Sequence, residues 1–254
     1  MHDAEGALTL LGVRAVEACT RAGVEVVIVS ARGSTGVAPI ARTLGQGSWI
    51  YEAGAAVVLD GEEHWLTGDL LPHDDHGTVF AQIEATGAPA LLLEHFAGRL
   101  EEHGPWNRNR EVSHLFRGCV DAFEADALLL DRGHGGLRLI DNGVLRTAEA
   151  SASGRQLRAY HLVPAAVSKA AGVAFHMRAR GYAPEDCIAV GDSREDLGMA
   201  ASVGAFWLVA NGLARDPDIG AALREHRNVR VTEAGHGPGV YEAVVTTLAE
   251  RGAR

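Results

Sequence analysis

The sequence predicts an α/β protein whose mostly parallel sheet is interrupted by a smaller, inserted α+β domain. Apolar runs rich in β-branched residues predict buried parallel strands, and helix-like segments alternate with them in the first and last thirds of the 254-residue chain. The middle loses this alternation and is rich in Gly, His, Asn and Pro, which predicts the insertion. We therefore expect the core at residues 1–60 and 161–254, and the inserted domain at residues 61–160.

The first third predicts a helix, a strand and a second helix. Thr9 is expected to cap a helix that ends before Gly23, because glycine is the residue type typical of the position after a helix. Residues 24–29 (VEVVIV) have the near-continuous β-branched character of a strand buried on both faces. Ser30 follows this strand and leads into a helix expected through Leu44.

The last third repeats the alternation and so predicts further βαβ units of the same sheet. Helices are expected at residues 168–180, 197–203 and 240–250, and strands at residues 187–190, 206–210 and 229–231. Ser168 is expected to cap the first of these helices.

The middle segment predicts short elements separated by turns. Asp141-Asn142-Gly143, directly after an apolar run at residues 137–140, is a hairpin signal. His114 and Arg117 could face a substrate from this domain, but we favour their interpretation as surface residues of a helix.

Composition and charge exclude several classes of protein. The hydrophobic share of 47% and the charged share of 22% are typical of globular domains, and a net charge of -10 argues against general nucleic-acid binding. No apolar run approaches the roughly 20 residues of a membrane span, and the N-terminus does not resemble a signal peptide. Three scattered cysteines predict neither a disulfide framework nor a zinc knuckle. We expect a cytoplasmic monomer or homodimer with no nucleic-acid or membrane partner.

Polar side chains follow the predicted strands where parallel sheets bind ligands, beyond their carboxyl ends. Ser30 follows the first strand, and Asp192 and Asp196 follow the strand at residues 187–190 with the close spacing that suits a hydrated hard cation. Lys169 begins a helix, where a cation opposes the macrodipole and so indicates an anionic neighbour. Taken singly, Ser30 could be a helix cap, Lys169 a solvated side chain, and Asp192 part of a turn. Together they predict a metal-assisted phosphoryl site.

Three segments carry a resemblance to a known family. VEVVIVSARGS, HLVPAAVSKAAGV and CIAVGDSREDLGMA resemble motifs two, three and four of the haloacid dehalogenase (HAD) superfamily of phosphatases. The insertion resembles the type IIB cap of the branch that holds Cof-like, sucrose-phosphatase-like and mannosyl-3-phosphoglycerate-phosphatase-like enzymes. The resemblance implies a HAD-like Rossmannoid core with a cap, and a Mg²⁺-dependent phosphatase of a small phosphorylated metabolite. A sugar phosphate or a glycosyl-3-phosphoglycerate is the substrate it implies.

The resemblance also implies roles for the residues that match the motifs. Ser30 would bind the phosphoryl oxygens, and Lys169 would neutralise the phosphoryl group and orient the nucleophile. Asp192 would ligate Mg²⁺, and Asp196 would support that site.

Two further positions match residues that the family places near the substrate. Arg32 matches the Arg of the family's [ST]GR triplet. Asn211, which follows the strand FWLVA, resembles the Asn of the family's gNA turn. We expect both to bind substrate. The family's Glu-Asn-Gly-Ala turn is Glu-Ala-Gly-Ala here, at residues 52–55, so contacts of that Asn amide are absent.

The largest departure from the family is at the front of the chain. The DxDGT motif, whose first Asp attacks phosphorus and whose second acts as general acid and base, has no counterpart. Residues 1–9 resemble the stretch directly after that motif. The first core strand is therefore expected to be missing, and its neighbours to have unpaired edges. We favour a chain whose recorded start lies downstream of the true one, and the alternative is a catalytically inactive phosphate-binding or regulatory module.

Other signals are weaker. A Rossmann-type nucleotide enzyme is a third hypothesis, but the GHGPG stretch at residues 235–239 is not GxGxxG and only one helix remains after it. The loop His73-Asp74-Asp75-His76 offers metal-ligand types, yet a solvated loop explains it more simply.

Overall fold

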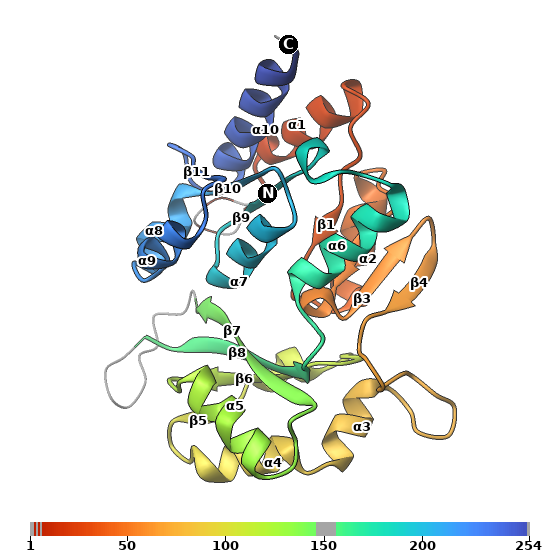
Figure 1. Cartoon of the computed structure of the whole chain (residues 1–254), viewed down its shortest axis with the longest axis vertical. Helices are drawn as coiled ribbons and strands as arrows, with labels where there is room; N and C mark the ends of the chain where they lie inside the picture. The colour runs from red at the N-terminus through yellow and green to blue at the C-terminus, as the bar shows by residue number, and fades with distance from the viewer. Residues whose placement is uncertain (1–2, 4, 6, 146–155, 253–254) are drawn as a thin grey trace.

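The computed structural model describes residues 3, 5, 7–145 and 156–252, which form a core and an inserted domain beneath it in Figure 1. The α-helices are α1 (Leu10–Arg21), α2 (Ser34–Thr43), α3 (Val79–Ala85), α4 (Ala88–His95), α5 (Ala122–Asp131), α6 (Lys169–Arg180), α7 (Arg194–Leu197), α8 (Ala210–Arg215), α9 (Ile219–Ala222) and α10 (His236–Gly252). The 3₁₀ turns are η1 (Glu52–Gly54), η2 (Gly104–Asn107), η3 (Pro184–Asp186), η4 (Gly198–Ala201) and η5 (Leu223–Glu225).

The core contains two separate half-sheets. The first has the order β1 (Ile28–Val29), β2 (Trp49–Tyr51), β3 (Ala56–Leu59) and β4 (Glu62–Trp65), in which β1 and β2 are parallel and the rest antiparallel. The second has the order β11 (Val229–Val231), β10 (Ala205–Leu208) and β9 (Ile188–Gly191), all parallel. No ladder joins β1 to β9 within the described residues. The alternating α/β architecture predicted from the sequence is confirmed.

The first strand is shorter than predicted. Of residues 24–29, only Ile28 and Val29 pair, with Trp49 and Ile50 of β2. Because β1 has a partner strand on one side only, the rest of the apolar run pairs with no strand among the described residues.

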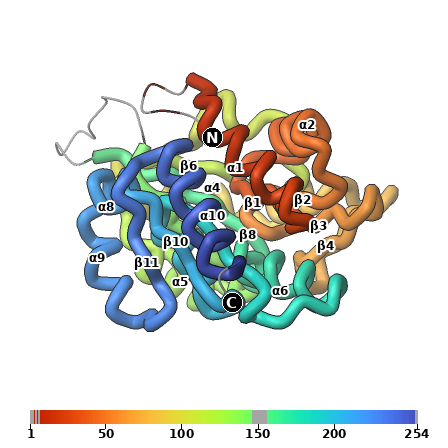
Figure 2. The backbone as a smooth tube through the Cα atoms, turned by 90° about the horizontal axis from the view of Figure 1, so that it is seen from above, coloured from red at the N-terminus to blue at the C-terminus, as the bar shows by residue number. Residues whose placement is uncertain are grey.

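Helices connect and cover the half-sheets. The N-terminal α1 packs against the C-terminal α10, and the two lie side by side in Figure 2. The middle helix α6 contacts β2 and β3 of the first half-sheet and η4 and α7 beside the second. The predicted caps of α1 and α6 are confirmed, since Thr9 accepts from the N–H groups of Leu11 and Gly12, and Ser168 from that of Ala171.

The inserted domain has a four-stranded antiparallel sheet whose order is β5, β6, β8 and β7. These strands are β5 (Leu100–Glu102), β6 (His114–Gly118), β7 (Leu137–Val144) and β8 (Arg158–Pro164). Helices α3, α4 and α5 lie on the face away from the core (Figure 1), over an apolar cluster that includes Tyr160 and Leu162. The first half-sheet continues to Trp65, past the boundary expected at residue 60. The inserted sheet likewise continues to Pro164, past the boundary expected at residue 160.

Two predictions for the inserted domain are wrong. The chain does not reverse at Asp141-Asn142-Gly143, because β7 runs on through a register shift to Val144. His114 and Arg117 lie on a central strand rather than on a helix surface, and His114 is buried, stacked on Phe80 with ring centroids 3.6 Å apart.

None of the described helices is both long and apolar enough to span a bilayer.

A charged network ties α6 to the first half-sheet. The Glu25 carboxylate, just before β1, accepts hydrogen bonds from Arg180 at 3.0 Å and from the Tyr182 hydroxyl at 2.9 Å. Arg180 also donates to both carboxylate oxygens of Asp60 at 2.7 Å. Burial opposes ionisation of Glu25, but the bonds from Arg180 and Tyr182 outweigh it and hold the pKa of Glu25 below its ordinary value.

We expect Glu25→Gln to lower the free energy of unfolding by about 1 kcal/mol near pH 7. A depressed folded-state pKa adds stability that is present above the ordinary glutamate pKa of about 4.3 and is lost as pH falls through the folded-state value. Urea unfolding at pH 7 and pH 3 should therefore show a difference from the parent chain that shrinks in acid. Glu17→Gln, which breaks an exposed pair with Arg21, is the control and should change little at either pH.

Candidate functional site

The polar residues that follow β1 and β9 lie at the edge of the core that faces the inserted domain. Ala31, just after β1, accepts a 2.7 Å hydrogen bond from Arg110 of the inserted domain. Helix α7, just after β9, contacts β7. Both parallel strands therefore end at the same rim, as their positions in Figure 1 also indicate.

The Lys169 ammonium is the centre of the described contacts. It is 5% exposed, and its Nζ lies 2.6 Å from Asp196 Oδ1 and 2.6 Å from Glu195 Oε2. The Glu195 carboxylate also accepts from the Lys169 backbone N–H at 3.0 Å. Burial disfavours the charge, but Asp196 and Glu195 outweigh it and raise the pKa of Lys169. The ammonium is thus held charged at the start of α6, where the sequence indicated an anionic neighbour.

Asp196 fixes the loop that carries Asp192. Its Oδ2 accepts from the backbone N–H groups of Asp192 and Ser193 at 3.0 and 3.1 Å, while its Oδ1 accepts from Lys169. Burial opposes the charge, yet Lys169 and these donors hold the pKa of Asp196 below its ordinary value. A Cβ at Gly191 would collide with the Asp196 side chain, so the close approach requires glycine there.

Asp192 is the accessible carboxylate of the group. Its Oδ2 accepts from Asn211 Nδ2 and from Arg215, each at 2.7 Å, and its side chain is 35% exposed. Its Oδ1 accepts none of the hydrogen bonds found in the described part of the chain. Asn211 Oδ1 in turn accepts from the His236 N–H at 2.6 Å, so this amide orients Asp192 against the start of α10.

Ser30 and Arg32 form a separate part of the rim. The Ser30 Oγ accepts from the Arg32 N–H at 3.2 Å, and the Arg32 side chain is exposed. No hydrogen bond among the described residues joins Ser30 directly to Lys169. The two are connected through η1: Ala53 N–H donates to the Ser30 carbonyl, and a Cβ on Gly54 would collide with the Ser168 carbonyl.

The Glu52 carboxylate, which the sequence analysis did not single out, joins the core to the inserted domain. It is fully buried and accepts from the backbone N–H groups of Glu111, Val112 and Ser113 at 2.6 to 3.0 Å, and from the Ser113 hydroxyl at 2.9 Å. The substituted turn at residues 52–55 pointed to this position, but nothing in the sequence marked residues 111–113 as its partners.

His161 was also missed. Tyr160 and Leu162 of β8 pack into the cluster under the helices, so the alternation of a strand turns His161 toward the core. It is 2% exposed, and its Nδ1 has no partner among the residues described. Burial, assisted by nearby Arg110 and Lys169, holds the pKa of His161 well below its ordinary range, so the ring is neutral.

The donor set fits one hydrated divalent cation rather than a closed metal site. In the described ranges no three His, Cys, Asp or Glu side chains converge as ligands. Asp192 offers an uncommitted carboxylate oxygen, whereas both Asp196 oxygens are engaged. Mg²⁺ keeps several waters and is often bound through one or two carboxylates together with substrate phosphate, which is compatible with Asp192.

The chain is similar to proteins named phosphoglycolate phosphatase. The relative from Pyrobaculum neutrophilum is 30% identical over 256 residues, which covers 95% of this chain and 92% of the relative. The relative from Methanoculleus marisnigri is 27% identical over 246 residues, covering 95% and 90%. No family model matches the chain.

Solved structures share the fold. A structure from Thermoplasma acidophilum superposes with a TM-score of 0.65 at 16% identity, covering 96% of this chain and 92% of that one. The sucrose-phosphatase of Synechocystis sp. PCC6803 superposes with a TM-score of 0.62 at 14% identity, covering 94% and 92%.

We expect Glu52→Ala to lower the free energy of unfolding by about 3 kcal/mol, because three backbone N–H groups, two of them buried, lose their acceptor. Urea unfolding followed by tryptophan fluorescence measures the change. Glu62→Ala, at an exposed position of β4, is the control and should stay within about 0.5 kcal/mol of the parent. Equal stability of the two variants would show that the hydrogen bonds from residues 111–113 to Glu52 do not contribute to the free energy of unfolding.

Asp196→Asn should cost about 3 kcal/mol, because it removes one partner of a buried ammonium. A double-mutant cycle with Lys169→Met tests the cause. The loss of unfolding free energy in the double variant should be smaller than the sum of the losses in the two single variants. Asp131→Asn, exposed on α5, is the matched control. Strict additivity of the two losses would contradict the pairing of Lys169 with Asp196.

Proposed function

We propose that this chain, which belongs to the haloacid dehalogenase (HAD) superfamily of phosphatases, hydrolyses a small phosphomonoester with Mg²⁺ held at Asp192. The observation that carries the proposal is the buried Lys169 ammonium, fixed by Asp196 and Glu195 beside an accessible Asp192 carboxylate. A cation and a potential metal ligand, both held in place before substrate arrives, are what a phosphoryl group requires for electrostatic stabilisation.

Lys169 and Ser30 would hold the phosphoryl oxygens. An ammonium has three donors; Lys169 donates one to Asp196 and forms an ion pair with Glu195, which leaves a donor for a phosphoryl oxygen. The Ser30 hydroxyl accepts from Arg32 N–H, so its own hydrogen is available to donate. Each bond would strengthen as charge builds on the equatorial oxygens.

The charges of the site favour a divalent cation. Three carboxylates (Asp192, Glu195 and Asp196) face two cationic side chains, Lys169 and Arg215. A dianionic phosphate would add further negative charge, so the residues alone do not balance it. Bound at Asp192, Mg²⁺ would supply the missing positive charge and polarise the phosphoryl group.

Ser30 and Lys169 stabilise charge, but they perform neither covalent attack nor proton transfer to the leaving alcohol. We assign neither step to a residue of the site described above. The attacking carboxylate implied by the family resemblance is, in our proposal, not one of Asp192, Asp196 or Glu195. Asp196 and Glu195 are engaged with Lys169 and the loop after β9, and Asp192 is the residue proposed to hold Mg²⁺.

The substrate is proposed to be phosphoglycolate or a sugar phosphate. Relatives that span nearly the whole chain are named phosphoglycolate phosphatases, and a fold neighbour is a sucrose-phosphatase. The exposed Arg32 side chain, two residues after Ser30, would receive a second anionic or polar group of the substrate. Asn211 is proposed to act through Asp192, to which it is hydrogen-bonded.

A phosphate-binding module without turnover is the second candidate. It is favoured by the full engagement of Asp196, and by the lack of a third convergent ligand among the described residues.

Calorimetric titration with inorganic phosphate tests the site. We expect Mg²⁺ to tighten phosphate binding about tenfold, and Asp192→Asn to abolish that gain. Asp74→Asn, in an exposed loop of the inserted domain, is the control and should retain it. A gain that survives Asp192→Asn would remove the metal role of this residue. Phosphate release from phosphoglycolate and a sugar-phosphate panel then separates the enzyme from the binding module.

A further inference from the structure

Two side chains of the inserted domain lie beside the phosphoryl site, and the proposed function uses neither. Arg110 comes from the loop before β6, and it donates to the Ala31 carbonyl directly after Ser30. His161 lies on β8, on the side of the inserted sheet that is turned toward the core. It is close enough to Lys169 for that ammonium to add to the effect of burial on the pKa of the ring.

The Arg110 guanidinium donates only to uncharged acceptors within the described chain. Its Nε donates to the Trp106 carbonyl at 3.0 Å, and its Nη1 to the Ala31 carbonyl at 2.7 Å and the Ser113 hydroxyl at 3.5 Å. Its Nη2 donates none of the hydrogen bonds found there. Burial lowers the pKa of Arg110 more than nearby Glu52 raises it. A half-buried cation without a full counter-charge attracts an anion more strongly than an exposed one does.

The buried ring of His161 has cationic neighbours. It is 2% exposed, and its Nδ1 has no partner among the described residues. Besides burial, the groups that lower the pKa of His161 are Arg110, Lys169 and His103, and no carboxylate of the described chain is among them. A buried polar atom without a partner costs free energy unless a ligand supplies the partner. With its proton on Nδ1, a neutral imidazole donates to such a ligand.

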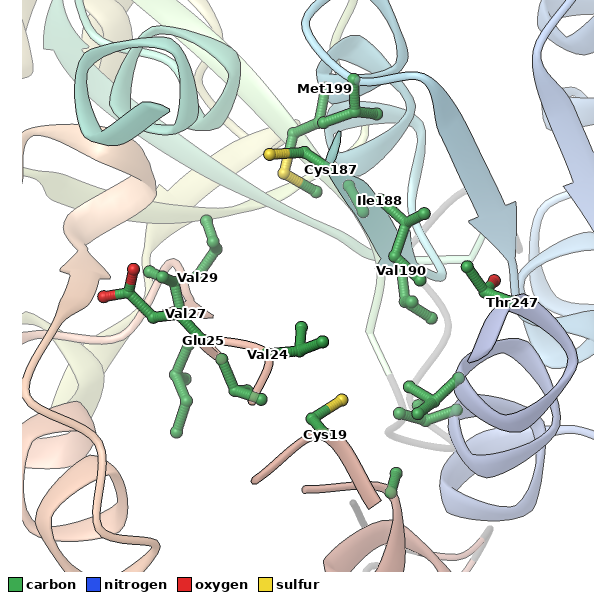
Figure 3. A pocket seen from close by; sticks show the side chains of 18 of the residues that line it. Cys19, Val24, Glu25, Val27, Val29, Cys187, Ile188, Val190, Met199 and Thr247 are labelled. Carbon is green, nitrogen blue, oxygen red and sulfur yellow. The ribbon is translucent and has the colours of Figure 1, made fainter. Parts of the chain in front are cut away.

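The cavity between the half-sheets is a different space. Its volume is about 690 Å³, and Figure 3 shows Val29 on one wall and Val190 on the other. Neither Arg110 nor His161 lines it. A charged group of a ligand would not be stabilised between such apolar walls.

We propose that Arg110 and His161 bind a carboxylate of the substrate, and so select a short phosphorylated hydroxy acid over a neutral sugar phosphate. A guanidinium and an imidazole N–H are donors that suit the two oxygens of a carboxylate. A sugar hydroxyl would also need an acceptor. Both oxygens of the nearby Glu52 carboxylate are already engaged, with the N–H groups of residues 111–113.

This role of Arg110 and His161 rests on the proposed function, because it takes the phosphoryl group to be held at Ser30 and Lys169. Since Arg110 is bonded to the residue after Ser30, a carboxylate bound there would be only a few bonds from the phosphoryl group. Phosphoglycolate, with a single carbon between its ester oxygen and its carboxylate, meets this requirement. The exposed Arg32 would approach the same carboxylate from the solvent side.

Two phosphonates that cannot be hydrolysed test the selection. Phosphonopropionate replaces the ester oxygen of phosphoglycolate with a methylene group, and hydroxypropylphosphonate carries a hydroxyl in place of its carboxylate. In calorimetric titrations with Mg²⁺ present, we expect phosphonopropionate to bind about tenfold tighter or more than the alcohol. Equal affinities for the two phosphonates would overturn the selection. If inorganic phosphate still binds in that case, the proposed function survives, whereas binding of none of the three ligands would overturn both.

Arg110→Gln should lower the affinity for phosphonopropionate about tenfold, and leave the affinities for the alcohol and for inorganic phosphate unchanged. The Ala31 carbonyl also loses a donor in this variant, so a merely structural role would weaken all three ligands alike, and that result would refute the assignment. Arg110→Lys keeps the cation and should recover part of the preference. Arg108→Gln, exposed in the same loop, is the matched control and should change none of the affinities.

His161→Phe keeps a ring of similar size without its nitrogens, and should reduce the preference for phosphonopropionate about threefold or more. In the parent chain labelled with ¹⁵N-histidine, phosphonopropionate should move the Nδ1 signal of His161 further than inorganic phosphate does. Equal movement with the two ligands would exclude His161 from the carboxylate. If Arg110→Gln or His161→Phe fails to fold, the two phosphonates and the histidine signal of the parent chain still decide.

Discussion

The ammonium of Lys169, buried between two carboxylates, is the interaction on which the site depends. A buried charge without partners would cost several kcal/mol, so Asp196 and Glu195 must stay where they are for α6 to begin where it does. The other oxygen of Asp196 accepts hydrogen bonds from backbone N–H groups of the loop after β9. The position of the accessible Asp192 carboxylate is thus a consequence of how the lysine is neutralised.

A second buried carboxylate, that of Glu52, fixes backbone of the inserted domain to the core. Glu52 sits in a tight turn with positive φ of 45° and reaches three successive backbone donors of the inserted domain. The same turn brings Gly54 against the start of α6. One short turn therefore positions the inserted domain relative to the core and also connects the loop at Ser30 with Lys169.

Much of this could be predicted from local patterns. Caps at Thr9 and Ser168 and the placement of Asp192 after a strand depend on neighbours in sequence, and the structure confirms them. The β-branched run at residues 24–29 forms a strand only at Ile28 and Val29, because its pairing depends on distant segments. Contacts between distant segments were not predictable, among them the partners of Glu52, the orientation of His161 and the pairing of Arg180 with Glu25. The prediction of a turn at Asn142 was wrong, because Gly and Asn are typical of β-bulges as well as of hairpin turns.

Helix α6 carries Lys169 as its first residue and Arg180 as its last, about 16.5 Å apart along the axis at about 1.5 Å per residue. The first is anchored to acidic groups beside β9, and the second to Glu25 and Asp60 beside β1 and β3. One stiff rod is therefore pinned at opposite ends to the two halves of the core. A twist of one half against the other would shift the lysine, so in the proposed function substrate affinity would depend on how firmly the halves are held together.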